Sequence, residues 1–430
     1  MGTLALHGGK PVRGASTKWP TWPISDAGDV KRMAEVVKSN RWSYDGPVEW
    51  AFAESFTKYV KAQHGMCSAN GTVAIQIALE ALDIGAYDEV IVTGLTWQAT
   101  AAACIDVNAV PVLVDVEPDT WCIDIEAVKA AITKKTRAVI VVHLYGCIAD
   151  MGRLQTLCKK EGLFLIEDCA HQHGTFWKDQ GVGSLGDMAT FSFQESKVLS
   201  SGEGGFNTCR TKQLFERLYS LRNCGRGFKD DMTNAVQSGN LRITEFQAVM
   251  LQGGLARLDA QVKKRDANAQ YLTSRLAEIP GVLPMRRRKE VTQQSYFNYA
   301  LRIDAKDLKI DNRLFVAALN AELSAKELFE PPYQPLNKCE LYKPHTKSRH
   351  RLNSDYWKAI NPKRFKLPVC TDAHEKSGVV VHHAALMGTK KDMDDIADAI
   401  TKIIDNVGDL KAAKNGTATT KKAFKARTRW

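Results

Sequence analysis

The stretch AVIVVHLYGCIADMGRLQTLCKKEGLFLIEDCA (residues 138–170) decides the fold class. An apolar run of strand length, AVIVVHLYG, is followed by an amphipathic segment with helical spacing and then by a second apolar run, LFLIEDCA. Continuous apolar strands separated by helices are typical of a parallel sheet that is covered on both faces. The stretch therefore predicts an α/β fold with its ligand site at the carboxyl ends of the strands.

The same alternation extends on both sides of this stretch. EVIVTG (89–94) and VPVLVDV (110–116) are further predicted strands, and each precedes a segment with helical spacing. Beyond this region the chain becomes mostly helical and then mixes short strands with helices. We therefore predict a large α/β domain with a mostly parallel sheet at 1–260, a smaller α+β domain at 261–410, and a basic tail at 411–430.

Composition places the chain among globular proteins, because 44% of its 430 residues are hydrophobic and 25% are charged. The apolar runs are too short to span a membrane, and the N-terminus lacks the pattern of a secretory signal. A cytoplasmic protein without a membrane partner is expected. Ten cysteines are scattered without a CxxC pair or a metal-ligand spacing, which predicts free thiols and no metal site.

The formal charge of +11 is concentrated at one end of the chain. Residues 411–430 hold seven Lys or Arg and no acids, which leaves +11 − 7 = +4 for the rest. This tail has no apolar period of a helix and is expected to be a disordered, solvated extension. No nucleic-acid partner is expected from it.

Four features lie where predicted strands end. Asp168 closes an apolar run and needs a cationic or donating partner, because a buried carboxylate is costly alone. Lys197 follows the strand-like FSF and precedes the loop SSGEGG, where burial would make its amine reactive. The turn NGT opens a helix whose first amides, with the Thr72 hydroxyl, suit a phosphate. Trp97 offers an aromatic face to a flat ring.

Each feature alone has an ordinary structural explanation: an ion pair, a surface lysine, a helix N-terminus and a core aromatic residue. Together they describe a site for a planar, phosphorylated, electrophilic pyridine. Pyridoxal 5'-phosphate fits this description, because its aldehyde condenses with a lysine and its ring nitrogen is held protonated by a carboxylate.

In these motifs the chain resembles the DegT/DnrJ/EryC1/StrS sugar aminotransferases of pyridoxal phosphate fold type I, which are similar to aspartate aminotransferase in fold. The resemblance extends from about residue 20 to 405. The stretches that carry it are SNRWSYDGP (39–47), NGTVAIQIAL, TWQATAAACIDVNAVPVLVDVEPDTWCID, IEDCAHQHG, FSFQESKVLSSGEGG, GNLRITEFQA (239–248) and VVHHAAL (380–386).

The resemblance implies a role for each matching residue toward the cofactor. Lys197 would form the imine with the cofactor aldehyde, and Asp168 would meet the pyridine nitrogen. Ala170 and Trp97 would lie on opposite faces of the ring. His171 stands where many members carry glutamine, near the ring hydroxyl, and its protonation state is left open by the sequence.

The phosphate would be held by Gly71, Thr72 and Ser192. The resemblance also implies that Asn240 reaches the cofactor phosphate of a neighbouring subunit. The expected active unit is therefore a homodimer with shared active sites.

The activity implied is a ping-pong transamination, because Lys197 excludes the branch of the family that carries histidine there and dehydrates its substrates. The amino donor would be glutamine or glutamate, and the cofactor would pass through pyridoxamine 5'-phosphate. WSYDG, PPYQPLNK (331–338) and VVHHAAL look most like the aminocyclitol branch of amino-sugar and antibiotic biosynthesis, which aminates scyllo-inosose or 2-deoxy-scyllo-inosose. Alternatives are a nucleotide-linked keto-sugar aminotransferase and an amino-hydroxybenzoate synthase.

Four side chains are candidates for substrate contact: Trp42, Tyr145, His382 and His383. The alternative for the histidine pair is a packing role at the end of a strand. Arg242 and Glu245 are expected to form a structural ion pair.

Two other classes use the same fold. A non-catalytic regulator would not need the combination of lysine, aspartate and phosphate-binding residues. An enzyme of elimination or decarboxylation would share Lys197 and Asp168 and differ in its products.

Overall fold

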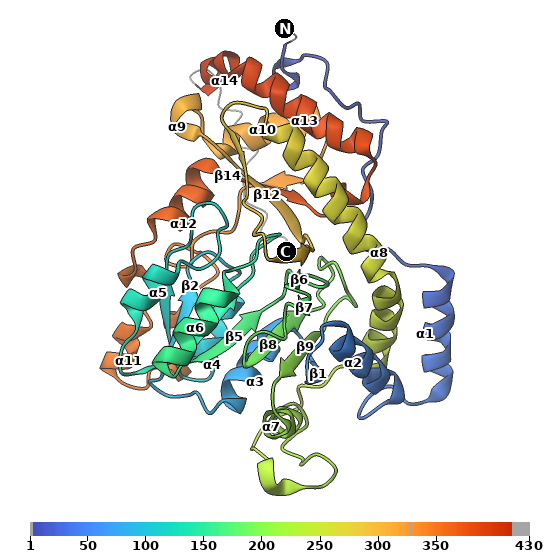
Figure 1. Ribbon diagram of the computed structural model, residues 1–430, viewed down its shortest axis with the longest axis vertical. Coiled ribbons are helices and arrows are strands. Elements are labelled where there is room, and N and C mark those ends of the chain that lie inside the picture. Colours follow the sequence, from blue (N-terminus) through green and yellow to red (C-terminus); the bar gives the residue numbers. More distant parts are fainter. Residues whose placement is uncertain (1–2, 327, 415–430) are drawn as a thin grey trace.

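A computed structural model describes residues 3–326 and 328–414, and two parts lie one above the other in Figure 1. The lower part surrounds a seven-stranded sheet of order β1-β9-β8-β5-β4-β2-β3. Its strands are β1 (His64–Ser68), β2 (Glu89–Thr93), β3 (Val110–Val114), β4 (Thr136–Val142), β5 (Phe164–Asp168), β8 (Met188–Ser192) and β9 (Gly205–Cys209). Neighbouring strands pair in parallel except at β9, which is antiparallel to β1 and β8. The predicted mostly parallel sheet is confirmed.

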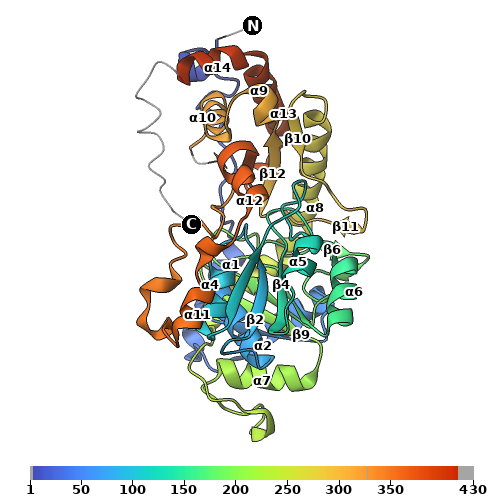
Figure 2. The same ribbon diagram turned by 90° about the vertical axis from the view of Figure 1, so that its left-hand side faces the viewer.

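Both faces of this sheet are buried, as the continuous apolar strands require. In β4, Ile140 points into one core and Val139 and Val141 point into the other. Helices cover the two faces (Figures 1 and 2). They are α2 (Pro47–Tyr59), α3 (Gly71–Ala81), α4 (Ala99–Asp106), α5 (Ile125–Ala131), α6 (Met151–Glu161) and α7 (Lys212–Arg222).

Side chains at the helix N-termini fix where the helices begin. The Asn70 side chain accepts a hydrogen bond from the Val73 amide and so starts α3 immediately after β1. Thr244 and Gln247 form a capping box at the start of α8 (Glu245–Leu276). The short link between β1 and α3 places the first turn of α3 at the edge of the sheet where the site lies.

The upper part contains a four-stranded antiparallel sheet of order β10-β12-β14-β13. Its strands are β10 (Val282–Pro284), β12 (Asn298–Ile303), β13 (Phe329–Glu330) and β14 (Gly378–His382). Around it pack α9 (Ala305–Leu308), α10 (Asn312–Glu322), α13 (Lys390–Asp405), α14 (Val407–Lys414) and the end of α8. We call this part the small domain. A three-stranded sheet of β6 (Phe176–Trp177), β7 (Gln180–Gly181) and β11 (Val291–Gln293) completes the strands.

The long helix α8 runs from beside the large sheet up into the small domain (Figure 1). The predicted division at residue 260 therefore falls inside one helix. Two other segments also cross it. Leu4, predicted with the large domain, lies in the core of the small domain. Leu336, Tyr356 of α11 (Ser354–Ala359) and Cys370 of α12 (Pro368–Asp372), all predicted with the small domain, lie in a core of the large sheet.

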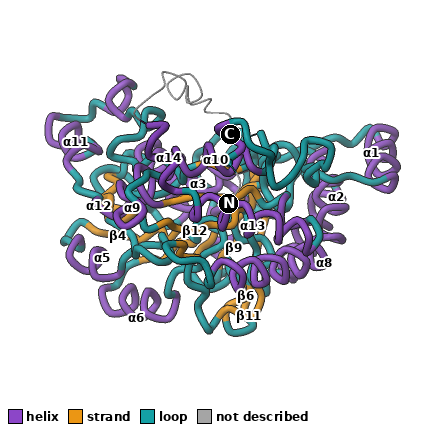
Figure 3. The backbone as a smooth tube through the Cα atoms, turned by 90° about the horizontal axis from the view of Figure 1, so that it is seen from above, coloured by secondary structure: helices purple, strands orange, loops and turns teal. Residues whose placement is uncertain are grey.

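Seen from above, α1 (Ala27–Ser39) stands at the periphery, beside α2 and α8 (Figure 3). Among residues 3–326 and 328–414, no helix has both the length and the apolar character that crossing a membrane requires. The ten cysteines all lie in this range and are free thiols, of which eight are buried. The predicted tail begins inside α14, so its first four residues are helical, and residues 415–430 lie outside the described residues.

Candidate active site

A cavity of about 610 Å³ lies at the carboxyl ends of the large sheet, where the small domain meets it. Asp168 ends β5, Ser192 ends β8 and Trp97 follows β2, so three strands deliver side chains to the same place. Phe297 and His382, at the ends of β12 and β14, close it from the small domain. The cavity therefore lies at the strand ends, where the sequence predicted the site.

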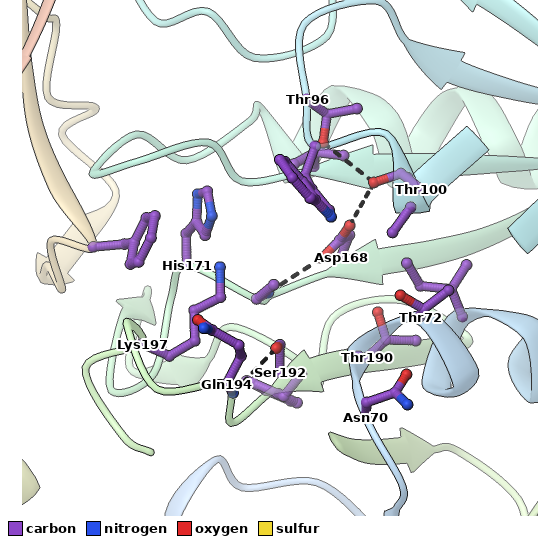
Figure 4. Close-up of a pocket in the computed structure, with 18 of the residues that line it drawn as sticks. Asn70, Thr72, Thr96, Thr100, Asp168, His171, Thr190, Ser192, Gln194 and Lys197 are labelled. Atoms are coloured by element: carbon purple, nitrogen blue, oxygen red, sulfur yellow. Dashed lines mark hydrogen bonds between the residues drawn. The ribbon is translucent and has the colours of Figure 1, made fainter. Parts of the chain in front are cut away.

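Asp168 is buried and meets two hydrogen-bond donors (Figure 4). Thr100 Oγ1 donates to Oδ2 at 2.9 Å, and the Ala170 amide donates to Oδ1 at 3.2 Å. Burial nevertheless raises the pKa of this carboxyl, against the effect of these donors and of nearby Lys197. A further cationic N–H in the cavity would therefore stabilise the ionised form of this carboxyl group.

Lys197 projects into the cavity from the loop after β8 (Figure 4). Its Nζ lies 4.0 Å from the centre of the Phe297 ring. Burial lowers the pKa of this amine from 10.5 to about 8, and Asp168 opposes the shift. The neutral, nucleophilic form of this amine is thus far more accessible at physiological pH than that of a solvated lysine, as a covalent role needs.

The first turn of α3 forms a cradle for an anion. Gly71, Thr72 and Ser192 line the cavity together there. The first amides of a helix have no intrahelical acceptor and carry partial positive charge. A Cβ at Gly71 would lie 2.7 Å from Ser192 Cβ, so only glycine allows the helix and β8 to approach this closely. The structure thus brings the three predicted residues together at the cavity, and their binding of a phosphate stays a prediction.

His171 stands beside Lys197 in the cavity wall (Figure 4). Its Nδ1 accepts a hydrogen bond from the Tyr145 amide at 3.0 Å, and its ring stacks on Phe297 at 4.0 Å. Burial, with Lys197 nearby, holds the pKa of His171 well below its usual value. The ring is therefore neutral with its proton on Nε2, which answers the question that the sequence left open.

Of the predicted substrate residues, His382 lines the cavity, and burial lowers its pKa to about 4. Tyr145 and His383 do not line the cavity, so the structure contradicts the expectation that these two side chains contact the substrate. Tyr145 lies buried behind His171, where its hydroxyl accepts from the Tyr333 amide. His383 is fully buried and bonds the Ser196 carbonyl at 2.9 Å. The packing alternative holds for His383.

Two predicted residues lie outside the cavity lining. Trp42 is half exposed and donates to the Val37 carbonyl. Asn240 is exposed, and its side chain accepts from the Arg242 amide. The expected ion pair of Arg242 with Glu245 is wrong, because Arg242 donates to Asn223 while the Glu245 carboxylate accepts from the amides of residues 48 and 49.

Sequence reasoning missed several cavity residues. Thr100 lies one turn after Thr96, within a quoted motif, so its spacing was a usable signal. Tyr333 lies in PPYQPLNK, which was quoted only for the resemblance. Phe297, Asn298 and Glu330 carry no local signal, since the small domain brings them to Lys197 from 100 or more residues away.

A buried group of His143, Glu167 and Cys169 has donor atoms close enough together for a metal ion. Its hydrogen bonds favour another role. The His143 Nδ1 accepts from the Ala149 amide, which leaves the ring proton on Nε2, and Nε2 lies 3.2 Å from Glu167. Glu167 also accepts from the amides of residues 183, 185 and 186. Glu167 thus braces the loop after β7, and His143 has no free lone pair for a metal ion.

The sheet order, the two-part architecture and a buried lysine that shares one cavity with a strand-end aspartate are those of the pyridoxal phosphate-dependent transferase fold of type I. The chain belongs to the DegT/DnrJ/EryC1/StrS aminotransferase family, whose pattern matches residues 23–399, and it is an aminotransferase.

Known relatives cover nearly the whole chain. The L-glutamine:2-deoxy-scyllo-inosose aminotransferase of Streptomyces fradiae is 41% identical over 95% of this chain and 99% of its own length. The enzyme of the same name from Micromonospora echinospora is 38% identical over 96% of this chain and 100% of its own. The crystal structure of 3-amino-5-hydroxybenzoic acid synthase is 28% identical, with a TM-score of 0.77 over 90% of this chain and 99% of that one. The chain therefore lies within the aminocyclitol branch of the family.

Proposed function

We propose that this protein transfers the amino group of L-glutamine to the ring ketone of a free cyclitol, of the 2-deoxy-scyllo-inosose or scyllo-inosose type. The names of the relatives support this acceptor, since they are similar over nearly their full length. The charge of the cavity supports it independently and is the observation on which the choice of acceptor depends.

The described lining of the cavity holds one cationic side chain, Lys197. The two lining histidines, His171 and His382, are neutral because burial lowers their pKa values. The remaining charged side chains are acids, and Glu330 stands on the small-domain side. A nucleotide-linked sugar carries a diphosphate that requires cations or helix N-termini. A neutral polyhydroxyl ketone needs only donors and acceptors such as those of Asn298 and Tyr333.

The cofactor that these residues fit is pyridoxal 5'-phosphate. The anion cradle at Gly71, the carboxylate of Asp168 and the amine of Lys197 stand around one cavity, as its phosphate, ring nitrogen and aldehyde require. When bound, the cofactor supplies a carbonyl that carries the amino group and a ring that accepts the electrons of the substrate carbon.

Each side chain of the site then has a task. Asp168, fixed by Thr100, would hold a proton on the ring nitrogen of the bound cofactor. Lys197 would hold the cofactor through its amine and would serve as the base that moves a proton to or from the substrate carbon. His171 would offer its Nε2 proton to the ring oxygen, because its Nδ1 already accepts from the Tyr145 amide.

The experiment is a panel of acceptors with amide- and amine-labelled L-glutamine and mass detection of the product. We expect label from the amine in an aminated cyclitol, with no product from nucleotide-linked keto sugars. Amination of a nucleotide-linked sugar or a hydroxybenzoate precursor in place of the cyclitol would overturn the assignment of the acceptor. Product formed by elimination or loss of carbon dioxide would overturn the transamination itself.

We also propose a homodimer in which Asn240 reaches the cofactor phosphate of the partner. Support comes from the exposed surface around it, where Ser43 bridges Thr244 and the aromatic rings of Trp42 and Tyr44 are each about half exposed. Co-expression of Lys197→Ala with Asn240→Ala tests this sharing. A mixed dimer regains one intact site if the residues come from different subunits, whereas inactive mixtures of two dimeric variants would contradict it.

A further inference from the structure

Three successive backbone carbonyls around Lys197 are held by two side chains from distant parts of the chain. The indole Nε1 of Trp22 donates to the carbonyls of Glu195 and Lys197, each at 3.2 Å. The Nε2 of His383 lies 2.9 Å from the carbonyl of Ser196, between them. A carbonyl cannot donate, so His383 carries its proton on Nε2.

The two clamping side chains also contact each other. The rings of Trp22 and His383 meet edge to face, with centres 4.7 Å apart. The ring centres of His383 and Phe297 are 6.1 Å apart. The Nζ atom of Lys197 lies 4.0 Å from the centre of the same Phe297 ring. The pair therefore lies against the backbone of Lys197 and close to the support of its side chain.

A buried guanidinium stands behind this pair. Arg265 of α8 is fully buried and lies 4.9 Å from the Trp22 ring. Among the described residues, its three guanidinium nitrogens have no hydrogen-bond acceptor. Burial, together with the charge of Arg265, holds the pKa of His383 well below its usual value. Arg265 thus supports Trp22 through its ring face and favours the neutral form of His383 that can donate from Nε2.

Trp22 and His383 both belong to segments that contact or continue the small domain. His383 directly follows β14. Trp22 belongs to the N-terminal segment, which Arg13 fastens to α13 through Asp392 at 2.5 Å and Asp395 at 2.9 Å. Elements outside the large sheet and its helices therefore also hold the lysine loop.

We propose that Trp22 and His383 are positioning residues for the amine of Lys197. By fixing the carbonyls of Glu195, Ser196 and Lys197, they hold the lysine over Phe297 and make the N-terminal segment part of the catalytic apparatus. This inference rests on the role of Lys197 given under the proposed function.

Trp22→Phe removes the indole N–H and keeps a ring for Arg265 and His383. Trp19→Phe is the matched control, because Trp19 also donates to a carbonyl, that of Leu323, and also stacks under an arginine, Arg13 at 3.9 Å. Hydrogen exchange of the holoenzyme reports the loop through the amides of Glu195 and Lys197, which bond within it. We expect roughly tenfold faster exchange over 193–204 in Trp22→Phe alone. Equal exchange rates in the two variants would overturn the proposal that Trp22 holds the lysine loop.

The steady-state kinetic constants give a second measurement, which a general loss of stability would not change in the same way. We expect Trp22→Phe to lower kcat roughly tenfold with the KM for glutamine unchanged, and Trp19→Phe to keep both. His383→Leu should lower kcat in the same way, and His383→Gln, whose amide can donate in place of Nε2, should restore most of it. Equal kcat in His383→Leu and His383→Gln would contradict the proposal. A wild-type enzyme that is inactive with every acceptor would refute the proposed function instead. The hydrogen-exchange experiment would still test whether Trp22 holds the lysine loop.

Discussion

The hydroxyl of Thr100 donates a hydrogen bond of 2.9 Å to the carboxylate of Asp168 at the floor of the cavity. Thr100 belongs to α4 and Asp168 ends β5, so the bond joins a helix to a strand across the sheet edge. Burial makes this carboxylate costly to ionise, and the hydroxyl offsets part of the cost. The proposed role of Asp168 toward a pyridine nitrogen therefore depends in part on Thr100.

Replacement of Thr100 by valine tests this dependence. Without the hydroxyl the pKa of Asp168 rises further and its ion pair with a cationic ring weakens, so we expect roughly tenfold weaker cofactor binding. Titration of the apoenzyme with the cofactor, followed by absorbance, measures it. Thr96→Val is the control, because Thr96 contacts Thr100 at 3.2 Å and not the carboxylate. Equal dissociation constants for both variants would speak against the role of Thr100.

The buried amine of Lys197 lowers the stability of the apoenzyme. Its pKa falls from 10.5 unfolded to about 8 folded, so below pH 8 the unfolded chain holds this proton more tightly than the folded one. Apoenzyme with Lys197→Met should be more stable by on the order of 3 kcal/mol at neutral pH. The difference should shrink as pH rises from about 8 to 10.5.

Urea unfolding at several pH values measures this difference. Lys160→Met is the control, because the side chain of Lys160 is 78% exposed and should show no comparable gain. An apoenzyme that Lys197→Met destabilises at neutral pH would show that the amine is solvated or fully paired in the folded chain.

The neutral state of His171 predicts a simple pH profile. Because burial and Lys197 keep the pKa of His171 well below its usual value of 6.5, this residue should not titrate between that value and about pH 8. His171→Gln retains a donor and should keep the shape of the kcat profile across that range. His171→Leu should lower kcat without changing the shape. Disappearance of one limb of the profile in His171→Gln would mean that the histidine itself is titrating there.

The close contact at Gly71 predicts a selective loss of cofactor affinity. In Gly71→Ala the new Cβ meets Ser192 Cβ at 2.7 Å and pushes α3 away from β8, so we expect roughly tenfold weaker cofactor binding. Alanine is the better helix former, so helix propensity cannot explain such a loss. Gly152→Ala is the control, since its nearest neighbour is a side-chain oxygen at 3.7 Å. Unchanged affinity in Gly71→Ala would place the phosphate elsewhere.

The alternation of apolar strands and amphipathic helices could be predicted from the sequence because it is a local property of the chain. The runs at 89–94, 110–116, 138–146 and 163–170 appear as β2, β3, β4 and β5, and each helix between them forms. Strand-end residues such as Asp168 and the turn before α3 could be predicted for the same reason. The side chains of a parallel sheet's carboxyl ends meet at one edge whatever the details of the loops.

Sequence alone determined the fold class and predicted Lys197, Asp168 and the start of α3 as parts of one site, since periodicity, strand ends and helix starts are set by neighbours along the chain. Only the tertiary structure decided that Phe297 lies under the amine, that Tyr145 supports His171, and that Trp22 and His383 hold the lysine loop. Contacts between Lys197 and residues 22, 297 and 383 depend on how two domains pack, which no local pattern encodes. The neutral state of His171 likewise follows from burial, which appears only when the chain is folded.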